Sequence, residues 1–83
     1  MKPGIDEVAD FLRARISRRT RVPEAEIVEA TVLVDIGLES VDAVLICGEI
    51  EDAFQVEVEP ALMFEHDSFG AVLGAVMALF EER

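Results

Sequence analysis

Apolar residues recur every three or four positions in three segments of the chain, which is the spacing of amphipathic helices. The first segment runs from Ile5 to Ile16, with acidic residues near its start and arginines near its end, an order that suits the helix dipole. The clearest period lies near the end of the chain, where six apolar positions share one face. These are Phe69, Val72, Leu73, Val76, Met77 and Phe80. The pattern predicts a first and a last helix that each bury one face.

A further helix is predicted from Ser40 to about Phe54, with apolar residues on two sides. One stripe contains Ala43, Ile46, Cys47, Ile50 and Phe54, and a second contains Val41, Val44, Leu45 and Gly48. Serine is a favourable N-cap, so Ser40 marks the start. Plain core is one interpretation of Val41, Val44 and Leu45, and amphipathicity does not decide whether Val44 is core or surface.

The segments between these helices predict one long loop and one short helix. Residues 19–39 form a long connection, with a turn near Pro23 and with Ile27, Val32 and Leu33 as its anchors to the core. A loop of this length is often functional. Residues 55–59 are an extended link, Pro60 to Phe64 a short amphipathic turn, and the last helix begins at Asp67 or Ser68. We therefore expect an all-α single domain over residues 1–83, a four-helix bundle with a long first loop and a short third helix.

Length and composition fit one small folded domain. The chain has 83 residues, of which 52% are hydrophobic, and no apolar run is long enough to span a bilayer. The start lacks the pattern of a secretory signal, and one cysteine cannot form an internal disulfide. We expect a monomer in the reducing cytoplasm.

Charge is distributed unevenly along the chain. The formal net charge is −11, five arginines lie between Arg13 and Arg21, and no Lys or Arg follows from Val22 to Glu82. Solubility alone can explain an acidic surface. The absence of basic residues over this length nevertheless favours a basic protein partner, and it argues against nucleic acids and anionic membranes. The arginines are explained by the end of the first helix.

Residues for catalysis are few. The chain has one His and one Cys, with no metal-ligand spacing, no phosphate-binding glycine loop and no EF-hand pattern. Nothing in the sequence places His66 near Ser40, and no nucleophile-elbow pattern surrounds that serine. We expect a protein that is not an enzyme and has no metal site.

Ser40 is the most informative position. It follows a glycine turn at Gly37, begins a helix and stands between Glu39 and Asp42. A serine in this position is open to a modifying enzyme, and the helix N-terminus would stabilise a phosphodiester on it. Capping alone would explain the same serine.

The wider pattern decides between these readings. The stretch from Thr31 to Val41 resembles the signature of acyl carrier proteins, in which a leucine-rich loop leads into Asp-Leu-Gly-Leu-Asp-Ser-Leu. Phe54 with the following Val56 to Val58 looks like the family's exit from its second helix. The stretch from Phe64 to Phe69 looks like the Phe-Glu-x-Pro-Thr that opens its last helix.

The resemblance implies that a phosphopantetheinyl transferase attaches 4′-phosphopantetheine, taken from coenzyme A, to Ser40. The arm then holds acyl groups as thioesters for acyl-loading, ketosynthase or tailoring enzymes with basic docking surfaces, in polyketide or fatty-acid biosynthesis. The implied docking residues are Glu39, Val41, Asp42, Val44, Leu45, Gly48, Glu51 and Asp52. The implied acyl-chain pocket consists of Cys47, Ile50, Val58 and Met63, which are also expected core residues.

Some positions depart from the family pattern. Glu39 replaces Asp, which would slow loading or require a dedicated transferase if that Asp helps to position the transferase's magnesium site. Val41 replaces Leu or Met in the docking patch, and Asp67 replaces Pro as an alternative N-cap. Ser68 also lies in an Asp-Ser-Phe context, but too few residues follow it for the remaining helices, so capping explains it better.

Three alternatives remain. A peptidyl carrier is disfavoured because that subfamily usually has Gly-Gly-x-Ser-Leu around its serine. The start at Met1 suggests a free-standing protein, although a domain excised from a megasynthase would look the same. From a different class, the chain could be an unmodified acidic helical module that binds a basic partner surface, with Ser40 important only for stability.

Overall fold

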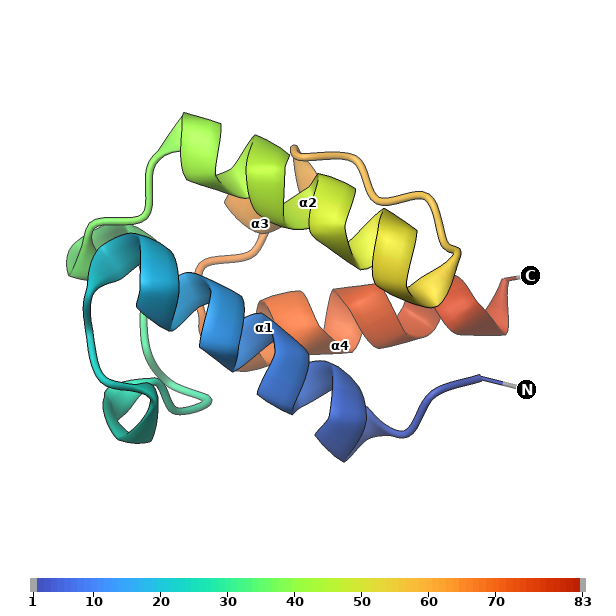
Figure 1. Cartoon of the computed structure of the whole chain (residues 1–83), viewed down its shortest axis with the longest axis horizontal. Coiled ribbons are helices and arrows are strands. Elements are labelled where there is room, and N and C mark those ends of the chain that lie inside the picture. Colours follow the sequence, from blue (N-terminus) through green and yellow to red (C-terminus); the bar gives the residue numbers. More distant parts are fainter. Residues whose placement is uncertain (1, 83) are drawn as a thin grey trace.

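Four helices follow one another along the chain in the computed structural model, which describes residues 2–82. They are α1 (Ile5–Thr20), α2 (Ser40–Phe54), the short α3 (Leu62–Glu65) and α4 (Phe69–Glu81). α1 packs against both α2 and α4, and α3 contacts α4 (Figure 1). The predicted all-α bundle with a long first loop and a short third helix is confirmed.

The core is built from the apolar stripes that the periodicity predicted. The stripe residues of α1 after Ile5 are buried, as are Ala43, Ile46 and Ile50 of α2 and most of the α4 face. Ile5, in contrast, is exposed because it lies in the first turn. Phe54 contacts the rings of Phe11 and Phe80 edge to face, with centroids 5.0 and 6.1 Å apart. These contacts join α1, α2 and α4.

The long loop between α1 and α2 contains two short 3₁₀ turns, Glu24–Glu26 and Leu33–Ile36. Two of its predicted anchors, Ile27 and Leu33, are almost completely buried, and Val32 is half-buried. The loop is therefore held to the bundle on both sides of its middle.

Backbone hydrogen bonds fasten this loop to the start of α4. The N–H of Phe69 donates to the carbonyl of Thr31 (2.8 Å), and the N–H of Gly70 donates to that of Glu29 (2.9 Å). In the other direction, the N–H of Leu33 donates to the carbonyl of Asp67 (3.1 Å). We call these three bonds the loop–α4 backbone ladder. They satisfy polar backbone groups of an irregular segment that would otherwise need water.

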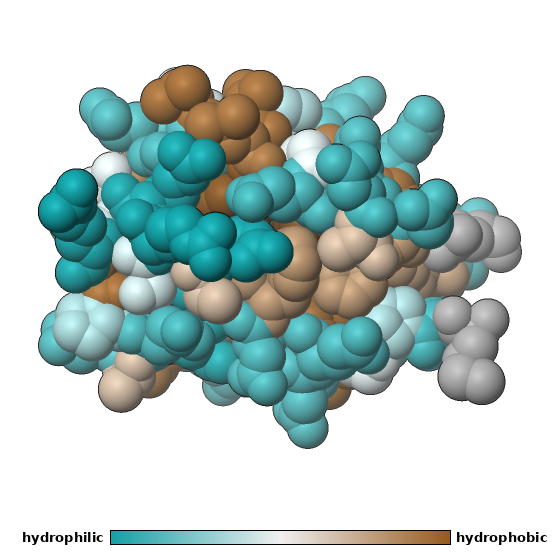
Figure 2. Space-filling view, viewed as in Figure 1, coloured by the Kyte–Doolittle hydropathy of each residue, from teal (hydrophilic) through white to brown (hydrophobic). Residues whose placement is uncertain are grey.

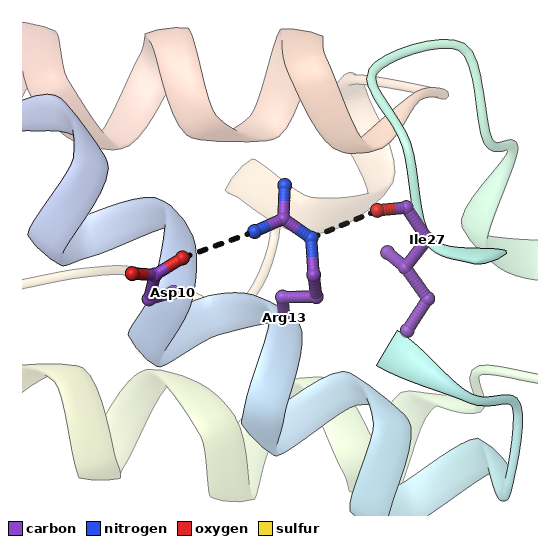
Figure 3. Close-up of polar contacts among 3 residues, drawn as sticks. All are labelled: Asp10, Arg13 and Ile27. Carbon is purple, nitrogen blue, oxygen red and sulfur yellow. Dashed lines mark hydrogen bonds and ion pairs between the residues drawn. The ribbon is translucent and has the colours of Figure 1, made fainter. Parts of the chain in front are cut away.

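Arg13 secures the same region from the side of α1. Its Nε donates to the carbonyl of Ile27 (2.9 Å), and its Nη1 pairs with Asp10 at 3.2 Å (Figure 3). Its guanidinium also lies over the Phe69 ring, 5.0 Å from the centroid. Arg13 thus connects α1, the loop and α4, which is more than the helix-end role expected from its position.

Gly70 and Gly74 of α4 are expected to respond differently to replacement by alanine. A Cβ on exposed Gly74 would have no neighbour within 4 Å, so Gly74→Ala should stabilise the fold by about 0.8 kcal/mol through helix propensity. A Cβ on Gly70 would lie 3.1 Å from the carbonyl oxygen of Glu29, so Gly70→Ala should bring no gain. Urea unfolding followed by circular dichroism would measure both. Equal stabilisation would show that Gly70 is not needed for the close approach.

The segment between α2 and α3 is extended, as predicted, with Val56 and Val58 pointing into the core. The carboxylate of Glu51 accepts a hydrogen bond from the N–H of Val58 (2.9 Å), which holds this link against α2. Within residues 2–82, the single β-type pairing is an isolated bridge between Val32 and Ser68. None of the described helices is long and apolar enough to cross a membrane.

Candidate functional site

The turn that presents Ser40 is held by buried leucines and one glycine. Gly37 has a φ of 94°, and its N–H donates to the carbonyl of Val34 (3.2 Å). This left-handed conformation is strained for other residues, so the predicted glycine turn is confirmed. The N–H of Leu38 donates to the carbonyl of Leu33 (3.1 Å), and both side chains are buried. These hydrogen bonds and the two buried leucines therefore hold the backbone that leads to Ser40 in place.

Ser40 is exposed and is the first residue of α2. Within the described part of the chain, its hydroxyl makes no hydrogen bond with any other residue. The N-cap is Glu39, so the expectation that Ser40 itself caps the helix was wrong. Ser40 Oγ is thus free at the positive end of a helix dipole.

Asp42 explains why the serine is not needed as a cap. Its Oδ2 accepts a hydrogen bond from the N–H of Glu39 (2.9 Å), and the side chain is buried at 8% exposure. This is the back-reaching half of a capping box, with Asp in place of Glu. The expected role of Asp42 in partner docking is therefore corrected: its carboxylate faces the cap and not the solvent. The spacing of Glu39 and Asp42 was the available signal for this role.

The second apolar stripe of α2 lies on the surface. Val41, Val44 and Leu45 are 60%, 53% and 42% exposed, so the alternative that they are core residues was wrong. Figure 2 shows an apolar patch over the part of α2 that follows Ser40, with hydrophilic residues around it. Glu39, Gly48 and Asp52 are exposed as well, while Glu51 is half-buried through its bond to Val58. We call Val41, Val44 and Leu45 the α2 patch.

The four residues expected to line an acyl-chain pocket belong to the core. Cys47, Ile50, Val58 and Met63 are each at most 3% exposed and belong to one buried cluster. Burial, followed by the charge of Glu51, raises the pKa of the Cys47 thiol from 9.0 to about 11. Cys47 is therefore an unreactive thiol at neutral pH.

Ser68 and the arginines have structural roles. Ser68 is the N-cap of α4, and its hydroxyl oxygen accepts a hydrogen bond from the N–H of Ala71 (3.2 Å). The cap predicted for Ser68 is confirmed, and Asp67 is not the N-cap.

Arg15 pairs with Glu49 of α2 at 3.3 Å and lies over the Phe11 ring, and neither contact was predicted from the sequence. Arg18 and Arg19 are in the last turn of α1, as expected from the helix dipole.

No group of His, Cys, Asp and Glu side chains that could hold a metal ion is found among residues 2–82. His66 ends α3 and is half-buried, on the segment that leads into α4.

The family model described as the phosphopantetheine attachment site matches residues 10–76. The chain therefore belongs to the family of carrier domains that bear covalently attached 4′-phosphopantetheine. Domains of this kind hold a cargo and interact with modifying and biosynthetic enzymes without being catalytic themselves.

Two solved structures have the same fold. One is a free-standing peptidyl carrier protein from a secondary metabolic pathway of Acinetobacter baumannii, with 22% identity and a TM-score of 0.79 over 89% of this chain and 92% of that one. The other is the HMG-ACPI domain of the CurA module from Lyngbya majuscula, with 19% identity and a TM-score of 0.76 over 99% and 89%. No curated protein sequence matches the chain.

Proposed function

We propose that Ser40 is the attachment site of the phosphopantetheine arm and that the chain carries acyl groups as thioesters. The observation that carries this proposal is the exposed hydroxyl at the first residue of α2, which makes no hydrogen bond to the described residues because Glu39 and Asp42 form the cap. Ser68 is less suitable because its hydroxyl is already used in capping α4.

Loading would form one bond and break another. Ser40 Oγ attacks a pyrophosphate phosphorus of coenzyme A, adenosine 3′,5′-bisphosphate leaves with the electron pair, and the hydroxyl proton passes to a base of the transferase. The position of Ser40 at the first residue of α2 suits the resulting phosphodiester. Its negative charge would lie at the N-terminus of a fifteen-residue helix, where free N–H groups and the dipole favour an anion.

The α2 patch and nearby carboxylates would form the docking face. Exposed aliphatic side chains give a partner a small apolar contact, and the charges of Glu39 and Asp52 attract a basic surface over a longer range. The occupants we propose are the transferase and then acyl-loading, ketosynthase or tailoring enzymes. Cys47, Ile50, Val58 and Met63 would receive an acyl chain only if the core opened, because all four are buried in the core cluster.

The order Gly37-Leu38-Glu39-Ser40-Val41 supports a polyketide or fatty-acid type of carrier, since peptidyl carriers usually have Gly-Gly-x-Ser-Leu at these positions. The fold alone does not discriminate, because the two similar structures include one carrier of each kind.

Incubation of the apo-protein with coenzyme A, magnesium and a promiscuous transferase tests the proposal. Intact mass should rise by one phosphopantetheine. No gain with several transferases would favour the unmodified acidic module that binds a basic partner.

Thiol reactivity gives an independent prediction. At pH 8, well below the pKa of about 11 for Cys47, the buried thiol should not react with Ellman's reagent in the folded apo-protein. In the loaded protein the thiol of the arm should attack the reagent's disulfide and release one equivalent of thionitrobenzoate, and unfolding in guanidinium should release a second equivalent through the reaction of Cys47. Native apo-protein that reacts as fast as the unfolded chain would contradict the burial of Cys47.

A further inference from the structure

A groove lies at the carboxyl-terminal ends of α2 and α4, away from Ser40. Its volume is about 510 Å³, and its lining comes from the 55–59 link, α3 and the end of α4. Since α2 has fifteen residues, Gln55 lies about 22 Å along the helix axis from Ser40. A ligand in this groove would leave the serine and the α2 patch uncovered.

The floor of the groove is apolar. Val56 is buried, and Leu62 and Leu79 are half-buried beside it, so each of the last two keeps part of its side chain open to solvent. Contact with an aliphatic side chain would remove this area from water.

The rim of the groove is acidic. Glu57, Glu59, Glu65 and Glu82 line it, and all four are exposed. None of them forms an ion pair with the described residues, whose pairs are Lys2–Glu81, Arg13–Asp10 and Arg15–Glu49. From Val22 to Glu82 the chain contains no Lys or Arg, and Lys2 is paired with Glu81 at the end of α4. Carboxylates around one space create a negative potential that a ligand cation would relieve.

We propose that this groove binds a basic segment of a partner protein, in which Lys or Arg side chains flank an aliphatic residue. The aliphatic side chain lies on Leu62 and Leu79, and the cations contact the glutamates at the rim. Charge complementarity identifies this occupant, because a neutral apolar segment would leave four carboxylates unpaired and a purely basic one would leave the floor exposed. A partner held here could stay bound while Ser40 serves other enzymes.

The binding experiment uses the apo-protein, so its result does not depend on whether Ser40 is loaded. The probe is a short fluorescein-labelled peptide in which lysine alternates with leucine, titrated at low salt and followed by fluorescence anisotropy. The groove variant is Glu57→Gln/Glu59→Gln/Glu65→Gln. The matched control is Glu7→Gln/Glu26→Gln/Glu29→Gln, which removes the same charge from exposed glutamates elsewhere. Three lost rim contacts should weaken binding about tenfold in the groove variant, and the control should change it little.

Two further measurements locate the contact and its occupant. Replacing the peptide's leucines with serines should weaken binding, and the amide resonances of Val56, Leu62 and Leu79 should shift on titration. Equal weakening in both variants, no binding at all, or shifts centred on the α2 patch would overturn the proposal. Self-association in sedimentation experiments that the groove variant abolishes would assign the groove to a second copy and overturn the partner assignment.

Discussion

Replacing Ser40 with alanine is expected to abolish the mass gain produced by coenzyme A, magnesium and a promiscuous transferase. The reason is that the reaction needs a nucleophilic oxygen at the exposed start of α2, and alanine supplies none. The fold should survive, because Ser40 is exposed and the cap is formed by Glu39 and Asp42. Intact mass spectrometry measures the loaded fraction, which should fall from near completion to none.

Ser68→Ala is the matched control for this variant. It removes a hydroxyl of the same kind from the start of α4, where the oxygen accepts a hydrogen bond from the N–H of Ala71. It should load like the parent and lose about 1 kcal/mol of stability, the usual contribution of an N-cap. Loading that persists in Ser40→Ala and disappears in Ser68→Ala would transfer the attachment site to α4.

Phe69→Ala is expected to be the most destabilising single truncation of a phenylalanine. Phe69 is completely buried under the guanidinium of Arg13, and its N–H belongs to the loop–α4 backbone ladder. Removing a buried phenylalanine side chain costs about 3–5 kcal/mol. A domain of this length has a total stability of roughly 4–12 kcal/mol, so this truncation should remove at least about a quarter of the free energy of unfolding. Urea titration by circular dichroism suits a chain without Trp or Tyr.

Phe64→Ala makes the same chemical change at an exposed position. Phe64 is 45% exposed on α3, so its truncation should cost much less than that of Phe69. If both variants lost the same stability, the burial difference between the two rings would not be the cause.

The bounds of α2 were predictable because strong local signals stand at each end. Gly37 requires a left-handed turn shortly before Ser40, and the apolar stripe ends at Phe54, after which the chain becomes extended. The spacing of apolar residues along the chain was enough to predict that α1, α3 and α4 exist. Local periodicity determines such elements largely without knowledge of their neighbours.

The exposure of the α2 patch could not be derived from periodicity, because apolar residues lie on two sides of the helix. Which side is buried depends on where α1 and the 55–59 link pack, and that is a tertiary property. Asp42 was misassigned for a related reason: an acidic residue beside the serine fits docking and capping equally well until its hydrogen bond to Glu39 is known.

Arg13 and Arg15 show a further limit of sequence reasoning. Their positions near the end of α1 predict a favourable interaction with the helix dipole, but the basic residues in the last turn are Arg18 and Arg19. Their contacts with Phe69 and with Glu49, however, join residues more than thirty positions apart. The acidic groove was missed for the same reason, since its lining comes from separate segments that meet only in the fold.

The loop–α4 backbone ladder has a consequence for the timing of synthesis. Residues 29–33 come early in translation, but their hydrogen-bonding partners at 67–70 are made almost forty residues later. These three hydrogen bonds of the loop therefore cannot form on a nascent chain before the start of α4 has been synthesised. An enzyme that recognises the loop with all three bonds formed would encounter its target only after that point.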